Sequence, residues 1–126
     1  MLNNKKITKV LLVEDDNYLN RIIRNHMESE GYKVDSSLSY KDAIKIVKKQ
    51  NDKYDVLIVD YKLSNSNGKN GMDVFEKTKE ANPDIKTIMI SAYGSYAVKR
   101  DAFKKGINKF LDKPFFLEDL TFTVSH

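Results

Sequence analysis

Three short apolar segments, each followed by charged residues, limit the possible fold of this chain more than any other feature. They are residues 11–13, 56–59 and 110–111, and the charged side chains just beyond them include Glu14, Asp15, Asp60 and Lys113. An apolar run of this length with polar neighbours is typical of a strand buried in a parallel sheet. Ligands of open α/β sheets bind outside the carboxyl ends of the strands, so we expect these side chains at one edge of one sheet. Carboxylates crowded there repel one another unless a cation or a proton lies between them, which indicates a metal site beside an ammonium group.

Helical periodicity fills the intervals between the apolar segments. Strands are predicted at residues 9–13, 32–37, 56–59, 87–90 and 109–111, and helices at residues 17–30, 40–49, 71–80 and 95–105, with a last helix beginning at residue 117. Strands that alternate with helices imply right-handed crossovers and a parallel sheet covered by helices on both faces. The weakly apolar strand 32–37 is expected near an edge, and the strongly apolar strand 56–59 at the centre.

Capping residues and apolar spacing define the helices more closely. Asp16 or Asn17 can cap the first helix, and Gly31 can end it. Ser39 and Asp42 resemble a capping box, with Asp in place of the usual Glu or Gln. The side chains expected to face the core are Leu19, Ile22, Ile23, Met27, Ala43, Ile44, Val47, Met72, Phe75, Val98, Ala102 and Phe103.

Length and composition indicate a single soluble domain. The 126 residues suffice for one core and are too few for two. Charged residues make up 32% and hydrophobic residues 40% of the chain, which is typical of a globular protein. The chain has no cysteine, which excludes disulfides and thiolate metal sites. No stretch is long enough to span a membrane, and the apolar run after the first lysines is too short for a signal peptide, so we expect a cytoplasmic protein with no membrane partner.

The net charge of +4 would suit a nucleic-acid-binding protein. The basic residues are, however, scattered among 18 acidic ones, and no aromatic-plus-basic motif or helix-turn-helix pattern is present. We therefore expect no direct binding of nucleic acid by this domain.

Four sequence motifs, each at the end of a predicted strand, occur in an order that resembles a known family. They are Val13-Glu14-Asp15-Asp16, Asp60, Ser91-Ala92 and Lys113-Pro114-Phe115. Over nearly its whole length the chain resembles the receiver domain of two-component response regulators, the CheY-like proteins. The resemblance implies a flavodoxin-like (βα)5 fold, doubly wound, with strand order 2-1-3-4-5 and helices on both faces. It also implies that residues 1–126 form a single receiver domain, with the last helix cut short and no output domain.

The resemblance assigns a chemical role to the acidic residues. Asp60 would accept a phosphoryl group from the phosphohistidine of a sensor histidine kinase or phosphotransfer protein, and carboxylates are competent phosphoryl acceptors. The negative charges require Mg²⁺, or Mn²⁺, between them. Asp15 and Asp60 would bind the metal directly, Glu14 mainly through water, and Lys62 through its backbone carbonyl.

Further residues would hold the phosphoryl group and transmit its arrival. The ammonium group of Lys113 would bind a phosphoryl oxygen as a point charge. A cis peptide bond between Lys113 and Pro114 would direct this side chain toward the site. Ser91 would donate its hydroxyl to another oxygen and move inward, and Phe110 would follow. This pair would repack the face formed by the fourth helix, fifth strand and fifth helix, to signal to an output domain or downstream protein, with dimer formation possible on activation.

The chain departs from the family pattern at several positions. Ser64 replaces a proline that usually follows the phosphoacceptor, and Gly71 opens the third helix after a loop that is a few residues longer than usual. Lys62 and Tyr93 occupy positions that modulate the lifetime of the phosphoryl group in the family.

Three other functions remain open from the sequence. A degenerate receiver would act as a phosphorylation-independent interaction module, although all five site positions are retained. An Mg²⁺-dependent phosphatase with an aspartate nucleophile would need a second Asp where Lys62 stands. A flavin-binding flavodoxin would need a phosphate-binding first loop, which the acidic run 14–16 would repel. In the leading interpretation the domain is not an enzyme on other substrates and catalyses only its own phosphoryl transfer and hydrolysis.

Overall fold

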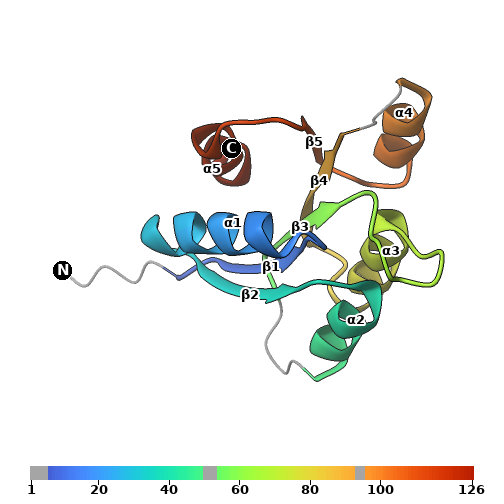
Figure 1. Cartoon of the computed structure of the whole chain (residues 1–126), viewed down its shortest axis with the longest axis horizontal. Helices are drawn as coiled ribbons and strands as arrows, with labels where there is room; N and C mark the ends of the chain where they lie inside the picture. Colours follow the sequence, from blue (N-terminus) through green and yellow to red (C-terminus); the bar gives the residue numbers. More distant parts are fainter. Residues whose placement is uncertain (1–5, 50–53, 93–95) are drawn as a thin grey trace.

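The computed structural model describes residues 6–49, 54–92 and 96–126. Strands and helices alternate through these residues (Figure 1). In chain order they are β1 (Lys9–Val13), α1 (Asn17–Ser29), β2 (Lys33–Ser37), α2 (Tyr40–Lys49), β3 (Val56–Asp60), α3 (Gly71–Ala81), β4 (Lys86–Ser91), α4 (Tyr96–Lys104), β5 (Lys109–Asp112) and α5 (Leu117–Ser125). No helix among these residues is both long and apolar enough to cross a membrane.

The strands form one parallel sheet in the order β2-β1-β3-β4-β5. This is the predicted flavodoxin-like topology. The strongly apolar β3 lies at the centre and the weakly apolar β2 at an edge, both as predicted. Parallel pairing aligns Val13 with Val59, and Asp60 with Ile90. The carboxyl ends of the strands therefore lie together along one side of the sheet, which we call the carboxyl edge.

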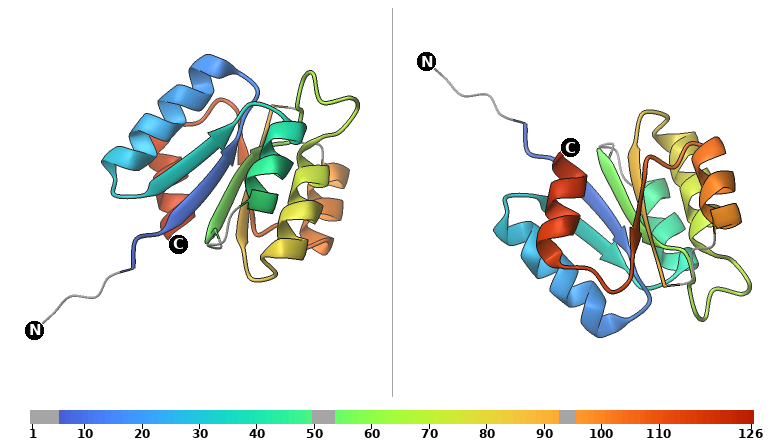
Figure 2. Two further views of the ribbon diagram at one scale, coloured as in Figure 1. Left: turned by 90° about the horizontal axis from the view of Figure 1, so that it is seen from below. Right: turned by 90° about the horizontal axis from the view of Figure 1, so that it is seen from above.

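The helices cover both faces of the sheet. Figures 1 and 2 show α1 and α5 on one face and α2, α3 and α4 on the other. Successive strand residues point to opposite faces. Leu12 and Ile58 therefore pack against α1 and α5, whereas Leu11 and Leu57 pack against the other three helices. Both sides of the central strands are consequently buried, which explains their continuous apolar sequence.

The helix ends partly follow the predicted capping pattern. The carboxylate of Asp16 accepts the backbone N–H of Leu19 and caps α1, and Gly31 ends this helix with a φ of 95°. Ser39 accepts the N–H of Asp42, but its own N–H bonds to a neighbouring serine, so only half of the expected capping box forms. A reciprocal box that the sequence analysis missed, between Asn70 and Asp73, opens α3.

The core contains most of the expected side chains, with local corrections. Ile22, Ile44 and Val98 are only half-buried and are not among the residues of the two core clusters, and Ile46 packs there in place of Ile44. Phe103 is exposed on the surface of α4, although it was expected to face the core. Val74, which was not predicted, is fully buried beside Phe75. Apolar periodicity cannot separate neighbouring residues at the border of a buried helix face, because both lie within the width of the apolar stripe.

Candidate functional site

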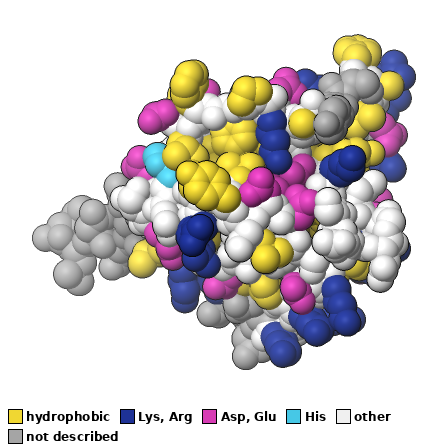
Figure 3. All heavy atoms as spheres, viewed as in Figure 1, with side chains coloured by type: hydrophobic (Ala, Val, Ile, Leu, Met, Phe, Trp, Pro, Cys, Tyr) yellow, Lys and Arg dark blue, Asp and Glu magenta, His cyan; other side chains and the backbone are white. Residues whose placement is uncertain are grey.

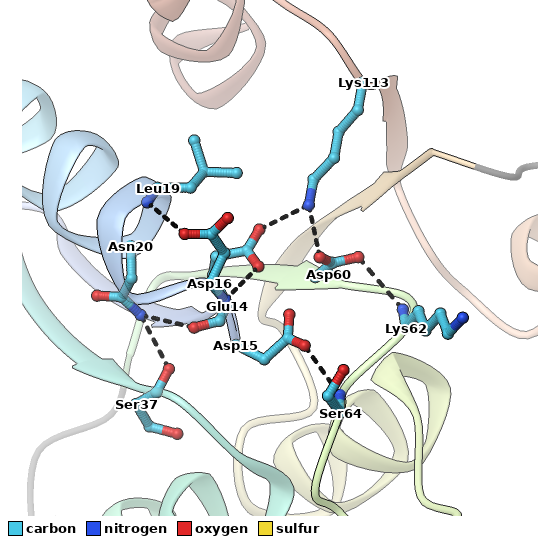
Figure 4. A network of polar contacts seen from close by, with 10 residues as sticks. All are labelled: Glu14, Asp15, Asp16, Leu19, Asn20, Ser37, Asp60, Lys62, Ser64 and Lys113. Atoms are coloured by element: carbon cyan, nitrogen blue, oxygen red, sulfur yellow. Dashed lines mark hydrogen bonds and ion pairs between the residues drawn. The ribbon is translucent and has the colours of Figure 1, made fainter.

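The turn after β1 carries the first two acidic residues of the site. Glu14 is fully buried and Asp15 is half-buried. The side-chain amide of Asn20 donates to the backbone carbonyls of Glu14 and Ser37, both at 3.0 Å, and joins this turn to the end of β2 (Figure 4). Glu14 Oε2 accepts the backbone N–H of Asp16 at 3.1 Å. Hydrogen bonds to both the backbone and the side chain of Glu14 therefore fix the position of this turn.

Asp60 ends the central strand β3 and is 5% exposed. One carboxylate oxygen, Oδ1, accepts the backbone N–H of Lys62 at 3.2 Å. The following loop returns close to the strand, because the N–H of Gly71 donates to the carbonyl of Tyr61 at 2.7 Å. A Cβ atom at Gly71 would lie 2.4 Å from the backbone oxygen of Asp60, so only glycine fits where α3 begins.

Lys113 reaches the acidic residues from the end of β5. Its Nζ atom donates to Asp60 Oδ2 at 2.7 Å and lies 3.0 Å from Glu14 Oε1. The contact with Glu14 lacks the direction of a hydrogen bond, and this buried Oε1 has no hydrogen-bond partner among the described residues. The peptide bond between Lys113 and Pro114 is cis. The ammonium group thus lies between two buried carboxylates.

The surroundings shift the pKa values of these groups in opposite directions. Burial, aided by the charge of Asp60 and opposed by the Asp16 amide, raises the pKa of Glu14 to about 8. Burial would also raise the pKa of Asp15, but hydrogen bonds from Ser64 and Glu14 outweigh it and hold that pKa below its usual value. For Lys113, burial acts to lower the pKa, yet Asp60 and Glu14 raise it overall, which favours the charged ammonium.

Three carboxylates meet closely enough to share one ion. Glu14, Asp15 and Asp60 each offer an oxygen, and these oxygens lie within 4.8 Å of one another. Oxygen donors of this kind suit hard divalent cations such as Mg²⁺ and Mn²⁺. Glu14 Oε1 is buried and accepts no hydrogen bond from the described residues, so it keeps an acceptor site that a metal-bound water can fill. The cluster therefore fits a metal ion.

The remaining predicted residues lie around this cluster. Ser91 ends β4, is 2% exposed, and its carbonyl accepts the backbone N–H of Lys113 at 3.0 Å. Phe110 is half-buried in β5 and packs edge-on against Phe103 of α4, with ring centroids 5.6 Å apart. Tyr93 lies outside the described residues.

Two contributions to the site were missed from the sequence. Asn20 joins the ends of β1 and β2, as described above, and the backbone N–H of Ser64 donates to Asp15 Oδ2 at 2.9 Å. The sequence did offer a signal for Asn20, because it is a polar residue on the apolar face of the predicted first helix and would need a hydrogen-bond partner there. No sequence signal identifies the Ser64 contact, because a backbone N–H is present at every non-proline position.

The fold and the site together define a CheY-like receiver domain. Residues 10–125 match the family model described as the response regulator receiver domain. The chain therefore belongs to the receiver domain family of two-component response regulators.

Longer bacterial regulatory proteins contain a segment that is similar to this chain. It is 27% identical over 128 residues to the transcriptional regulatory protein RprY of Bacteroides fragilis, covering 98% of this chain and 50% of the relative. It is 31% identical over 113 residues to the photosynthetic apparatus regulatory protein RegA of Rhodobacter capsulatus, covering 89% of this chain and 58% of the relative. The chain thus spans about half the length of these relatives.

A solved structure agrees with the fold. The signal receiver domain of a putative Luxo repressor protein from Vibrio parahaemolyticus superposes with a TM-score of 0.82 at 26% sequence identity. The superposition covers 95% of this chain and 88% of that chain.

Proposed function

We propose that this domain accepts, in the cytoplasm, a phosphoryl group from a phosphohistidine onto Asp60. The observation that carries the proposal is the position of this carboxylate. Asp60 is buried at the end of the central strand, 2.7 Å from the ammonium of Lys113 and beside two further acidic residues. Such an arrangement can balance negative charge that arrives at Asp60.

The transfer itself is a displacement at phosphorus. An oxygen of the Asp60 carboxylate attacks the phosphorus atom, the new P–O bond forms as the P–N bond breaks, and the imidazole of the donor leaves and takes up a proton. Asp15, Asp60, the Lys62 carbonyl and, through water, Glu14 would hold Mg²⁺ or Mn²⁺. When bound, the metal would neutralise charge between the carboxylates and the phosphoryl oxygens.

Two side chains would bind the phosphoryl oxygens after transfer. Lys113 already contacts Asp60, so its ammonium needs only a small displacement to reach an oxygen on the new group. Ser91 lies at the end of the neighbouring strand β4 and would donate its hydroxyl. Lys62 and Tyr93 would control how readily water reaches the acyl phosphate.

The signal would leave through the face formed by α4, β5 and α5. A phosphoryl group adds about −1.5 to −2 charges at one point, which can bias an element with two packing arrangements. Ser91 and Phe110 would link the site to this face. Response regulators work with histidine kinases and output domains, and the two longer relatives support an output domain or downstream protein as the partner here.

Acetyl phosphate with Mg²⁺ tests the proposal, with intact-mass spectrometry as the readout. The wild-type chain should gain one phosphoryl group and Asp60→Asn should gain none, because an amide oxygen is a poor nucleophile. Asp84→Asn, an exposed aspartate at the opposite edge of the sheet, is the matched control and should be modified like the wild type. A wild-type chain that stays unmodified would instead support the phosphorylation-independent interaction module.

A further inference from the structure

A hollow between α2 and the loop from β3 to α3 plays no part in the phosphoryl transfer proposed above. Its volume is about 630 Å³, within the range of small-molecule sites. One side is formed by α2 from Tyr40 to Lys48, and the other by loop residues that include Asn65, Asn67 and Lys69.

Four of the residues that line the hollow are lysines. Lys41, Lys45 and Lys48 follow one another along one face of α2, and Lys69 faces them from the loop. None of the four forms an ion pair within residues 6–49, 54–92 and 96–126, although several lysines elsewhere do. Asp42 is the one acidic residue in the lining. Figure 3 shows a gathering of basic side chains over α2, at its lower right.

The loop side of the hollow is fixed in position. Ser66 is buried, accepts the backbone N–H of Tyr40 at 3.1 Å, and donates to the carbonyl of Ser64 at 3.3 Å. The backbone N–H of Lys69 donates to the carbonyl of Ser66, and its ammonium lies 5.7 Å from the centre of the Tyr40 ring. A ligand would therefore meet a site that is already assembled, which reduces the entropy lost on binding.

We propose that this hollow binds a small ligand carrying several phosphate groups. Ammonium groups placed on both sides of a concave surface concentrate positive potential within it, and lysine is a common phosphate ligand. Linked phosphates bring several negative charges into a small volume and match this arrangement. An acidic peptide spreads its carboxylates along an extended chain, so it would match the three lysines along α2 but would make less use of Lys69 on the other side of the hollow.

Tripolyphosphate is the probe, titrated into the unphosphorylated protein without Mg²⁺ so that the outcome is independent of the phosphoryl chemistry at Asp60. Heteronuclear NMR should show saturable shifts of the amide resonances of residues 40–48 and 65–69. We expect the triple variant Lys41→Gln, Lys45→Gln, Lys69→Gln to weaken binding by about tenfold or more at roughly physiological ionic strength.

A matched triple variant controls for net charge. Lys33→Gln, Lys104→Gln and Lys109→Gln remove the same charge from exposed positions outside the hollow and should change affinity by less than about twofold. Circular dichroism verifies that both variants fold. Equal weakening in the two variants would overturn the proposal, as would shifts that never saturate. Tighter binding of a penta-aspartate peptide than of tripolyphosphate would also overturn it and would identify the surface as a protein-docking site.

Discussion

Asn20 shows how one buried side chain can position an acidic turn. It lies on the face of α1 shared with Ile23 and Met27, and it is 4% exposed. Instead of packing against apolar neighbours, its amide donates to the carbonyls that end β1 and β2. The Ser37 carbonyl also accepts the backbone N–H of Glu14 at 3.1 Å, so the amide of Asn20 adds a second link between the ends of the two strands.

Replacing Asn20 with Ala should therefore destabilise the protein. The change leaves the buried carbonyls of Glu14 and Ser37 without these hydrogen bonds, and we expect the free energy of unfolding at neutral pH to fall by about 2 kcal/mol. Urea denaturation followed by circular dichroism measures this difference.

Asn25→Ala is the matched control, because Asn25 lies exposed on the same helix. Alanine has the higher helix propensity, so this variant should unfold at the same urea concentration as the wild type or slightly above it. Equal stability of the two variants would show that the Asn20 amide contributes nothing to the turn.

At the scale of elements, α4 and β5 are joined by a small aromatic contact rather than by a continuous core. Phe110 meets the exposed Phe103 edge-on, and Lys99 lies over the Phe110 ring at 5.9 Å while pairing with Asp112 at 2.9 Å. Of the residues described in α4, Ala102 alone is fully buried. A helix held by so few buried groups can change its packing at low cost.

Beryllofluoride with Mg²⁺, which mimics the phosphoryl group, should therefore perturb more than the loops that carry the proposed metal ligands. We expect chemical-shift changes at Ser91, at Phe110 and along α4, because a hydroxyl drawn toward Asp60 leaves space that Phe110 can fill. Heteronuclear NMR measures the pattern, and Asp60→Asn under the same conditions is the control. Shifts limited to residues 14–16 and 60–64 would contradict the link between site and helix.

Across the whole molecule, charged groups lie at both the carboxyl and the amino ends of the strands, but their arrangement differs between the two. At the carboxyl edge, acidic residues gather against one lysine. At the opposite edge, Asp55 accepts the backbone N–H of Lys9 at 2.9 Å and pairs with Lys6 at 3.0 Å, which joins the start of β1 to the segment before β3. The first arrangement gathers three carboxylates at one point, whereas the second pairs a single carboxylate with one lysine.

The contribution of Asp55 should depend on pH. Burial acts to raise the pKa of Asp55, but the hydrogen bond from Lys9 and the charge of Lys6 outweigh it and hold the pKa below its ordinary value of 3.8. The folded protein thus binds this proton more weakly than the unfolded chain. Asp55 therefore stabilises the fold above the unfolded value, and the stabilisation is lost as the pH falls through the folded value.

Asp55→Asn should lower the free energy of unfolding at neutral pH by about 1 kcal/mol, a modest figure because the side chain is 31% exposed. The difference from the wild type should shrink below about pH 4. Urea denaturation across this pH range measures it. Glu80→Gln, which removes an exposed pair with Lys77 at 3.9 Å, is the control and should stay within about 0.5 kcal/mol of the wild type at every pH. A constant difference for Asp55→Asn would show that its charge is irrelevant.

Much of this architecture was predictable from local sequence. The continuous apolar run 56–59 identified the central strand, because a strand buried on both faces shows no alternation of polar and apolar residues. The same run placed Asp60 at the carboxyl edge of the sheet. Asp16 and Gly31 marked both ends of α1 by side-chain and backbone chemistry that acts within one helical turn. Periodicity was weaker at the margins of helix faces, as Ile44 and Phe103 show.

The sequence alone determined which residue types reach the carboxyl edge, since strand length and order along the chain carry them there. Only the tertiary structure decided how they meet. The ammonium of Lys113 lies between Glu14 and Asp60, which are separated from it by 99 and 53 positions in the chain. The carbonyls bridged by Asn20, the Ser64 amide on Asp15 and the hollow beside α2 likewise depend on contacts between separate elements. Such contacts are set by the packing of the whole core, because distances of a few ångströms between remote segments have no signature in local propensity or spacing.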